Sequence, residues 1–209
     1  MIFLPRREQT SFVRSLSFYF FLLTTLSLLF SNPLHAQTQL GADFNGAASN
    51  SLLGRATALN DDGTRVAIAS PESDDVGTNY GKVQIYEYNG TTWTQLGIDL
   101  NGNFTNEQFG FSVDLNDAGN RLIVGATGTT AQSGITYIYE YDGTNWQLLG
   151  SPITGTEIGE YSGYSVSMNS NGDTVAIGSQ RFNGATTNQG RVRIFQFNGT
   201  SWAQVGSQI

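Results

Sequence analysis

The fold is decided by a hexapeptide that occurs three times along the chain, as Tyr88-Asn89-Gly90-Thr91-Thr92-Trp93, Tyr141-Asp142-Gly143-Thr144-Asn145-Trp146 and Phe197-Asn198-Gly199-Thr200-Ser201-Trp202. The first two tryptophans are 53 residues apart, and the last two are 56 apart. An internal period of this length is typical of chains built from stacked copies of one small structural unit. Because each hexapeptide holds Asn-Gly or its equivalent, a strong hairpin signal, the repeating unit is predicted to consist of β-strands.

Glycines keep the three copies in a fixed register. The glycine that opens a copy lies 15 residues before the end of the second apolar run in every case: Gly54 to Ala69, Gly110 to Gly125 and Gly163 to Gly178. A later glycine lies 12 residues before each tryptophan, at Gly81, Gly134 and Gly190. Only the connection between these two segments differs in length, so the pattern separates a constant framework from one variable loop.

Each copy contains four segments that predict short antiparallel strands, which in the first copy are Ala56 to Leu59, Val66 to Ala69, Val83 to Tyr88 and Trp93 to Gly97. The second segment is almost continuously apolar, as in a strand buried on both faces, and the third alternates. Four strands in about 50–55 residues, repeated in tandem, are typical of a β-propeller blade. We therefore predict an all-β fold, a partial β-propeller of three four-stranded antiparallel blades at 53–108, 109–161 and 162–209.

The segment 37–52 predicts one additional, isolated outer strand followed by a linker. Thr38 to Gly46 matches Thr94 to Gly102, the region that begins with the fourth strand of blade 1, at a spacing of 56 residues. Propellers commonly close their ring by combining strands from the two ends of the chain, but blade 3 already has its own fourth strand. Three blades are too few for a ring, so we expect the sequence to be a fragment of a larger propeller.

Residues 1–36 predict a secretory signal peptide. Arg6, Arg7 and Arg14 precede an apolar run from Leu16 to Phe30, and small residues follow it. An uncleaved signal anchor is the alternative. The predicted location is secreted or at the cell surface, without a stable membrane span after cleavage.

Composition excludes most catalytic classes. Three of the ten basic residues and one of the 17 acidic residues lie in the leader, so the remaining chain carries 16 acids and 7 bases, a net charge of −9, which disfavours nucleic-acid partners. The single histidine, His35, also lies in the leader, and the chain has no cysteine. Serine–histidine and cysteine–histidine machinery, zinc sites and disulfides are therefore excluded, and we predict that the chain is not an enzyme.

The repeat resembles a known family. Phe109-Gly110-Phe111-Ser112-Val113, followed by Ile123-Val124-Gly125-Ala126-Thr127, is similar to the FG-GAP repeat of integrin alpha propellers and of bacterial surface proteins. The resemblance covers 38–209 and implies a propeller fold, often with Ca²⁺ bound in a loop of the Asp-x-Asp-x-Asp-Gly type. The corresponding turns here, such as Asn60-Asp61-Asp62-Gly63, are shorter and lack a closing ligand, so we expect hairpin turns and no cofactor.

Candidate binding residues lie on the longer loops. In a four-stranded antiparallel blade, the connections between strands 2 and 3 and between blades emerge at one end, and here these connections are the long ones. Binding residues concentrate on such loops. The candidates are Glu72, Asp74, Asp75, Glu107, Glu160, Tyr161, Arg181 and Phe182. The alternative is that they are solvated loop residues without a ligand.

The sequence alone predicts an exported, non-catalytic binding or adhesion module that recognises an extracellular protein or glycan. Two alternatives stay open. One is a carbohydrate-active enzyme that uses paired carboxylates, because glycoside cleavage needs no histidine. The other is a purely structural repeat array.

Overall fold

The computed structural model describes residues 38–46, 51–128 and 132–207, and within these ranges the chain forms fourteen strands and no helix. The chain divides into two parts, with the boundary between Gln39 and Leu40. All fourteen strands belong to the second part. The predicted signal peptide lies outside the described residues.

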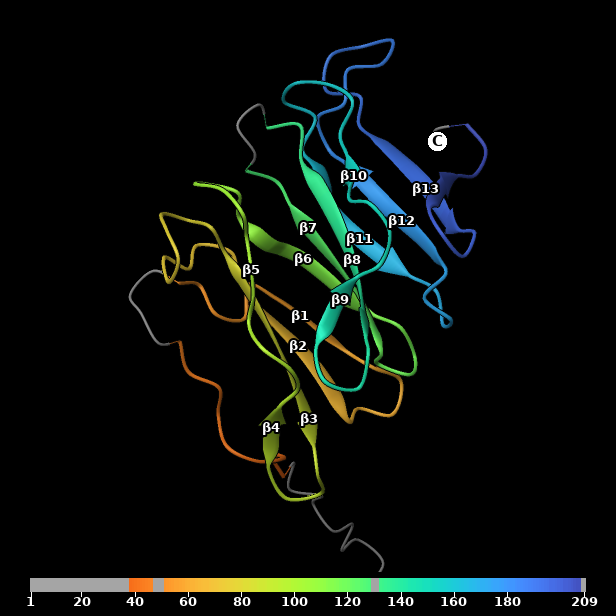
Figure 1. Ribbon diagram of the computed structural model, residues 1–209. Helices are drawn as coiled ribbons and strands as arrows, with labels where there is room; N and C mark the ends of the chain where they lie inside the picture. The colour runs from red at the N-terminus through yellow and green to blue at the C-terminus, as the bar shows by residue number, and fades with distance from the viewer. Residues whose placement is uncertain (1–37, 47–50, 129–131, 208–209) are drawn as a thin grey trace, which may run out of the picture. The chain divides into compact units, whose positions relative to one another are not determined.

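The strands form three antiparallel sheets that follow one another along the chain (Figure 1). Blade 1 contains β1 (Ala56–Leu59), β2 (Arg65–Ser70), β3 (Lys82–Tyr88), β4 (Trp93–Gln95) and β5 (Leu100–Asn101). Blade 2 contains β6 (Phe109–Leu115), β7 (Arg121–Ala126), β8 (Ile135–Tyr141), β9 (Trp146–Leu148) and β10 (Ile153–Thr154). Blade 3 contains β11 (Ser162–Met168), β12 (Thr174–Ser179), β13 (Arg191–Phe197) and β14 (Trp202–Gln204).

The predicted all-β, partial-propeller fold is confirmed. Each sheet has the same order of four strands, and the outer strand of blades 1 and 2 is broken into two pieces that pair with successive parts of the third strand. Thus β4 pairs with the end of β3, and β5 pairs with its start. In blade 2, β9 and β10 pair with β8 in the same way.

The N-terminal segment takes the contacts of an outer strand without forming one. Residues 38–46 belong to no ladder, in contrast to the predicted additional strand. The ring of Phe44 lies 4.5 Å from that of Tyr86 and 6.0 Å from that of Trp93. These ring contacts pack the segment against the third and fourth strands of blade 1.

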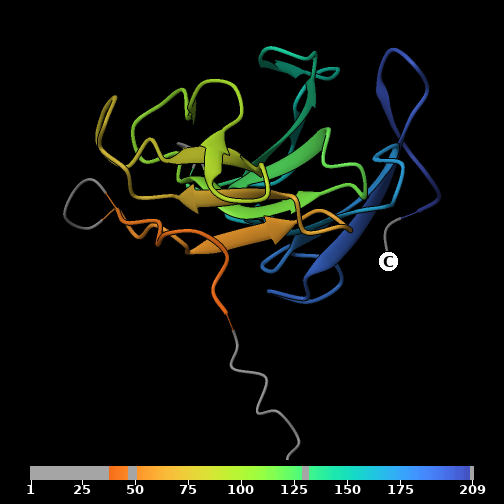
Figure 2. The ribbon, with the colours of Figure 1, turned by 90° about the horizontal axis from the view of Figure 1, so that it is seen from below.

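Neighbouring blades pack face to face, and Figure 2 shows the sheets in chain order from orange through green to blue. One apolar core lies between blades 1 and 2 and includes Ile85, Phe109 and Leu122, all fully buried. A second core joins blades 2 and 3 through Ile123, Ile138 and Ile177. The near-continuous apolar runs of β2 and β7 are explained by this arrangement, because both faces of each strand are covered by protein.

The three tryptophans are equivalent contacts between successive blades. Each indole Nε1–H donates to a backbone carbonyl of the preceding segment: Trp93 to Leu40 at 2.8 Å, Trp146 to Leu96 at 3.0 Å and Trp202 to Leu149 at 2.8 Å. The three acceptors occupy the same register position, one residue before a glycine of positive φ. Each repeat of the sequence therefore supplies the same contact to the segment that precedes it.

A second set of contacts joins neighbouring blades at the same end, beside the hairpins that precede the tryptophans. The Arg65 guanidinium bonds Glu87 of its own blade at 2.7 Å and donates to the carbonyl of Gly119 in the next blade at 3.2 Å. Arg121 repeats this arrangement with Glu140 at 2.8 Å and Gly172 at 3.2 Å. In blade 3, Thr174 takes the place of the arginine and Gln196 takes the place of the glutamate. Among the described blades, the arginine contact is therefore found in the two that are followed by another blade.

We predict that Trp146→Phe lowers the free energy of unfolding by about 2–3 kcal/mol, because the buried Leu96 carbonyl loses its donor and the indole leaves a void. Urea titration followed by circular dichroism measures this loss. The control is Leu148→Ala, an exposed change on the same strand that should shift stability by less than about 0.5 kcal/mol. Equal losses for the two variants would contradict the role of the indole.

We also predict that alkaline pH destabilises the protein through Tyr139. Burial, and then the nearby charge of Glu107, raises the pKa of Tyr139 well above its usual value of about 10. Above about pH 10 the phenol ionises in the unfolded chain but not in the folded chain. The contribution of Tyr139 to the free energy of unfolding is therefore fully present below that pH and declines as pH rises. Between pH 9 and pH 11, Tyr139→Phe should lose roughly 1 kcal/mol less than the wild type in urea titrations. An unchanged pH dependence would disprove this.

Candidate ligand cavity

One register position differs chemically between the blades and marks the candidate site. Three residues before the opening glycine, blade 2 has Glu107, blade 3 has Glu160 and blade 1 has Ser51. Both glutamates are fully buried, and Ser51 is also buried.

The side chain of Glu107 is satisfied entirely by its own surroundings. Its carboxylate accepts the backbone N–H of Asn103, the N–H of Phe104 at 3.2 Å and the hydroxyl of Tyr137 at 2.6 Å. Burial, and then the hydrogen bond to Glu107, raises the pKa of Tyr137 so that the phenol stays protonated and donates. Glu107 therefore fastens the loop between blades 1 and 2 to β8.

Glu160 plays the same part in blade 3 with a cationic partner. The Arg191 guanidinium donates to both of its oxygens, at 2.9 and 2.7 Å, and the N–H of Glu157 and the hydroxyl of Ser179 add further bonds. Arg191 also lies 3.9 Å from the centre of the Phe182 ring. Hydrogen bonds from protein groups thus satisfy the Glu160 carboxylate, as they satisfy Glu107 in blade 2.

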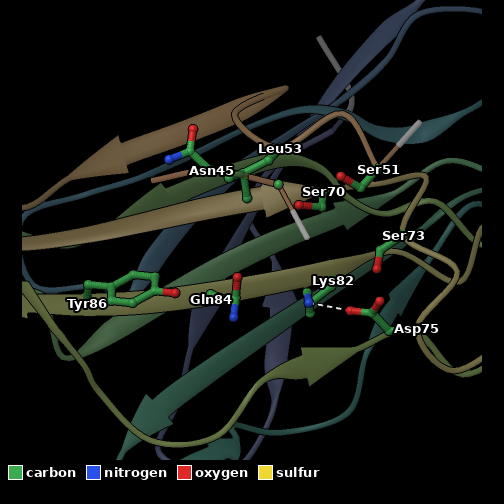
Figure 3. Close-up of a pocket in the computed structure, with 10 residues that line it drawn as sticks. Asn45, Ser51, Leu53, Ser70, Ser73, Asp75, Lys82, Gln84 and Tyr86 are labelled. Carbon is green, nitrogen blue, oxygen red and sulfur yellow. Dashed lines mark hydrogen bonds and ion pairs between the residues drawn. The ribbon is translucent and has the colours of Figure 1, made fainter. Parts of the chain in front are cut away.

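In blade 1 the short Ser51 leaves a cavity where the other blades hold a glutamate. The cavity has a volume of about 170 Å³, and the backbone and side chains that line it come from four parts of the chain (Figure 3). They are Asn45, Gly46, Ser51, Leu53, Ser70, Ser73, Asp75, Lys82, Gln84 and Tyr86. Most of these are polar, and the hydroxyl-bearing Ser51, Ser70 and Ser73 are all buried.

Lys82 is the main charge in the cavity wall. Its ammonium bonds the carboxylate of Asp75, as Figure 3 shows, and lies 3.5 Å from an oxygen of Asp99. Burial by itself would lower the pKa of Lys82, but hydrogen bonds and charges from the two aspartates outweigh burial and raise it. The hydrogen bond from Lys82 in turn lowers the pKa of Asp75. At neutral pH the cavity therefore presents a fixed ammonium beside a fixed carboxylate.

The remaining wall provides neutral polar groups and one aromatic face. Gln84 donates from Nε2 to Asp99 at 2.9 Å, which fixes the orientation of its amide. Tyr86 packs against Phe44, and burial raises the pKa of its phenol. Such a set of hydroxyl, amide, carboxylate and ammonium groups can bond a small molecule that carries several hydroxyl groups.

No group of three or more histidine, cysteine, aspartate or glutamate side chains in the described ranges is placed to hold a metal ion. In the turn between β1 and β2, Asn60 accepts the N–H of Arg65 at 2.7 Å and Asp62 accepts the N–H of Thr64 at 2.9 Å. The side-chain oxygens of this turn thus close the hairpin itself. The predicted absence of a cofactor stays a prediction.

The structure separates the eight residues predicted from the loops into distinct places. Asp75 lies in the cavity, and its neighbour Asp74 accepts the N–H of Asn79 at 2.6 Å within the same loop. Glu72 is half-buried nearby. The remaining five lie elsewhere: Glu107 beside β8, and Glu160, Tyr161, Arg181 and Phe182 around the start of blade 3.

Tyr161 and Arg181 form a surface pair. The Arg181 guanidinium lies 4.9 Å from the centre of the Tyr161 ring, and the Tyr161 hydroxyl donates to Gln132 at 2.8 Å. Tyr161 has a positive φ of 56°, as Leu52 and Gln108 have at the equivalent positions. Its backbone is therefore set by the repeat, and its side chain lies outside the cavity.

Reasoning from loops missed Lys82, Gln84, Tyr86 and Ser51. The signal that could have found them is the repeat alignment, which places Ser51 against Glu107 and Glu160. A serine in place of a glutamate leaves unfilled volume in blade 1, because the other contacts of the blade are kept.

Solved structures resemble the chain in fold. A putative 6-phosphogluconolactonase from Bacteroides fragilis has a TM-score of 0.56 and 15% identity, over 79% of this chain and 41% of that one. Sqt1 from Saccharomyces cerevisiae has a TM-score of 0.52 and 13% identity, over 82% of this chain and 39% of that one. This chain thus spans about two fifths of the length of each. At these identities the similarity concerns the fold alone.

No family model and no curated protein sequence matches the chain, so the resemblance to FG-GAP repeats stays a prediction. The predicted export, location and partners also stay predictions. In the described ranges no helix has the length and apolar character needed to cross a membrane.

The predicted function as a non-catalytic adhesion module is wrong. The similar structures are a putative sugar-lactone enzyme and Sqt1, and neither name denotes an adhesion protein. The structure adds a physical reason, because Glu107 and Glu160 are fully buried and bonded within the chain, where no protein or glycan surface could reach them. The prediction that the chain is not an enzyme relied on missing histidine and cysteine, but carboxylate and ammonium chemistry needs neither.

We predict that Lys82→Met lowers the free energy of unfolding at pH 7 by about 1–2 kcal/mol. The loss is below that of a fully buried pair, because Asp75 and Asp99 are both about a third exposed. The lowered pKa of Asp75 gives stability that is present above about pH 4 and is lost as pH falls further. The gap between wild type and variant in urea titrations should therefore narrow at pH 3, and Lys82→Arg should retain most of the stability. A gap independent of pH would contradict the ion pair.

Proposed function

We propose that the blade 1 cavity binds a small, uncharged sugar lactone and hydrolyses its internal ester. The observation that carries this proposal is the pairing of the Asp75 carboxylate with the Lys82 ammonium on one wall of a polar cavity. A volume of about 170 Å³ is below the roughly 300–1,000 Å³ of pockets for drug-sized ligands, so the cavity suits a single sugar ring.

The two charged groups supply complementary parts of ester hydrolysis. Asp75 accepts a proton from a water molecule as the water oxygen attacks the lactone carbonyl carbon. Lys82 stabilises the negative charge that develops on the carbonyl oxygen. The ring C–O bond then breaks, the proton passes to the departing alkoxide, and the product is an open-chain hydroxy acid. No cofactor takes part in these steps.

Charge selects an unphosphorylated substrate. Lys82 is shared between Asp75 and Asp99, so the immediate surroundings carry one net negative charge. A phosphate group would be repelled, whereas hydroxyl groups could bond Ser70, Ser73 and Gln84. The name of the Bacteroides fragilis protein supports the reaction class, and the charges favour a neutral lactone in this chain.

A glycosidase has less support from the same groups. Glycoside cleavage needs a carboxylic acid whose pKa is raised so that it stays protonated. Asp75 has its pKa lowered by Lys82, and this carboxyl group is ionised at neutral pH. Lactone hydrolysis requires a base and a positive partner for the oxyanion, and the cavity offers both.

The test is proton release from glucono-1,5-lactone at pH 6.5, compared with the spontaneous rate in buffer. We expect the wild type to accelerate hydrolysis, and we expect Asp75→Asn to reduce kcat by about 10²-fold or more. Ser51→Glu, which places in blade 1 the side chain that fills blades 2 and 3, should abolish activity and leave the urea midpoint nearly unchanged. The matched control is Asp61→Asn, the same chemical change on the hairpin between β1 and β2.

Two results would overturn the proposal. One is a wild-type rate equal to the rate in buffer. The other is an Asp75→Asn variant as active as Asp61→Asn. Faster turnover of the phosphorylated lactone would contradict the charge argument.

A further inference from the structure

The turn between β3 and β4 and the equivalent turn between β13 and β14 each contain an asparagine followed by glycine. The glycine backbone nitrogen can attack the asparagine side-chain carbonyl carbon and close a five-membered ring, because glycine has no Cβ to hinder the approach. Six such pairs occur along the chain, and they begin at Asn45, Asn89, Asn101, Asn171, Asn183 and Asn198. The structure surrounds these six side chains differently.

Backbone N–H groups polarise the side-chain carbonyl in the turns of blades 1 and 3. The Asn89 carbonyl accepts the N–H of Thr91 at 3.0 Å and the N–H of Thr92 at 2.9 Å. The same two bonds form around Asn198, also at 3.0 and 2.9 Å. Two N–H groups directed at one carbonyl oxygen stabilise the negative charge that develops there during attack, and they therefore lower the barrier.

A hydroxyl group lies beside the amide nitrogen in both turns. Asn89 Nδ2 donates to the Thr92 hydroxyl at 3.2 Å, and Asn198 Nδ2 donates to the Ser201 hydroxyl at 3.2 Å. The amide nitrogen must gain a proton before it can leave as ammonia. A hydroxyl group in contact with it can pass on a proton from water, which is general acid catalysis.

The attacking nitrogen is available in these two turns and is occupied in others. Gly90 and Gly199 are exposed, and within the described ranges neither N–H donates a hydrogen bond. In contrast, the N–H of Gly102 donates to a backbone carbonyl at 3.0 Å, and the N–H of Gly172 does so at 2.9 Å. The Asn101 carbonyl oxygen is also buried without a donor among the described residues. The pairs at 101 and 171 therefore serve as internal controls.

We propose that the turns at Asn89 and Asn198 promote their own modification, in which water replaces the side-chain amide and ammonia is released. The glycine nitrogen bonds to the asparagine Cγ and gives its proton to water, while the bond from Cγ to Nδ2 breaks and the protonated amide nitrogen leaves. A water molecule then opens the ring and leaves an aspartyl or isoaspartyl carboxylate. The net reaction consumes one water molecule and needs no oxidant, reductant or cofactor.

The equivalent turn of blade 2 already carries a carboxylate in this place. Asp142 accepts the N–H of Thr144 at 2.8 Å and the N–H of Asn145 at 2.9 Å. The bond from Asn145, and then the bond from Thr144, lower the pKa of Asp142, so the turn favours the ionised form. Blade 2 thus shows that the turn accommodates the aspartyl product. It also lacks the hydroxyl group, because Asn145 takes the place of Thr92 and Ser201.

The experiment is peptide mass spectrometry of the folded protein during incubation at pH 8, which measures conversion at each pair in one sample. We expect Asn89 and Asn198 to convert at least about tenfold faster than Asn101 and Asn171. In concentrated urea the four rates should become similar, because the turn bonds are lost. Equal rates in the folded protein, or a difference that persists in urea, would overturn the proposal.

Variants separate the hydroxyl group from the rest of the turn. Thr92→Val should slow conversion of Asn89 about tenfold or more and leave Asn198 of the same molecule unchanged, whereas Thr92→Ser should retain the wild-type rate. Asp142→Asn should create a slow site in blade 2, and Asp142→Asn combined with Asn145→Thr should convert as fast as Asn89. If neither Thr92→Val nor the combined variant changes the rate, the turn does not promote the reaction and the proposal fails.

Discussion

The bond from each tryptophan indole N–H to the carbonyl before a glycine of the preceding segment is the contact on which the other interfaces depend. Gly41, Gly97 and Gly150 follow the three acceptors, and a Cβ at these positions would lie between 2.7 and 3.1 Å from the indole Cδ1. Each glycine also has a φ near +75° to +80°. Only glycine combines that backbone with so close an approach, so the tryptophan and the glycine form one recognition unit.

Because the interfaces are fixed, the strands of a blade cannot move closer together to fill a gap. This explains why blade 1 keeps a cavity. When Ser51 replaces the glutamate of blades 2 and 3, the surrounding strands stay in register because the tryptophan and arginine contacts hold them. The missing volume is therefore kept as a cavity and does not collapse. The cation remains as Lys82, the equivalent of Arg191, and takes its carboxylate partner Asp75 from the loop between β2 and β3.

The sequence predicts the strands and their register well because hairpin glycines and the tryptophans act locally. The cavity was not predicted because four separate parts of the chain line it, which contribute Asn45, Ser51, Asp75 and Lys82. Glu107 and Glu160 show the same limit. A glutamate in a polar loop looks exposed in the sequence, but here backbone N–H groups of the loop draw each carboxylate inward, and Tyr137 or Arg191 completes the bonds. Whether a loop side chain points inward or toward solvent depends on such hydrogen-bond partners.

The ends of the repeat differ from its middle in one further way. Arg65 and Arg121 each reach a carbonyl of the following blade, but blade 3 has Thr174 at this position and Gln196 in place of the paired glutamate. The Thr174 hydroxyl instead donates to Asp173 of its own hairpin at 3.1 Å, so this end of blade 3 is closed by bonds within the blade.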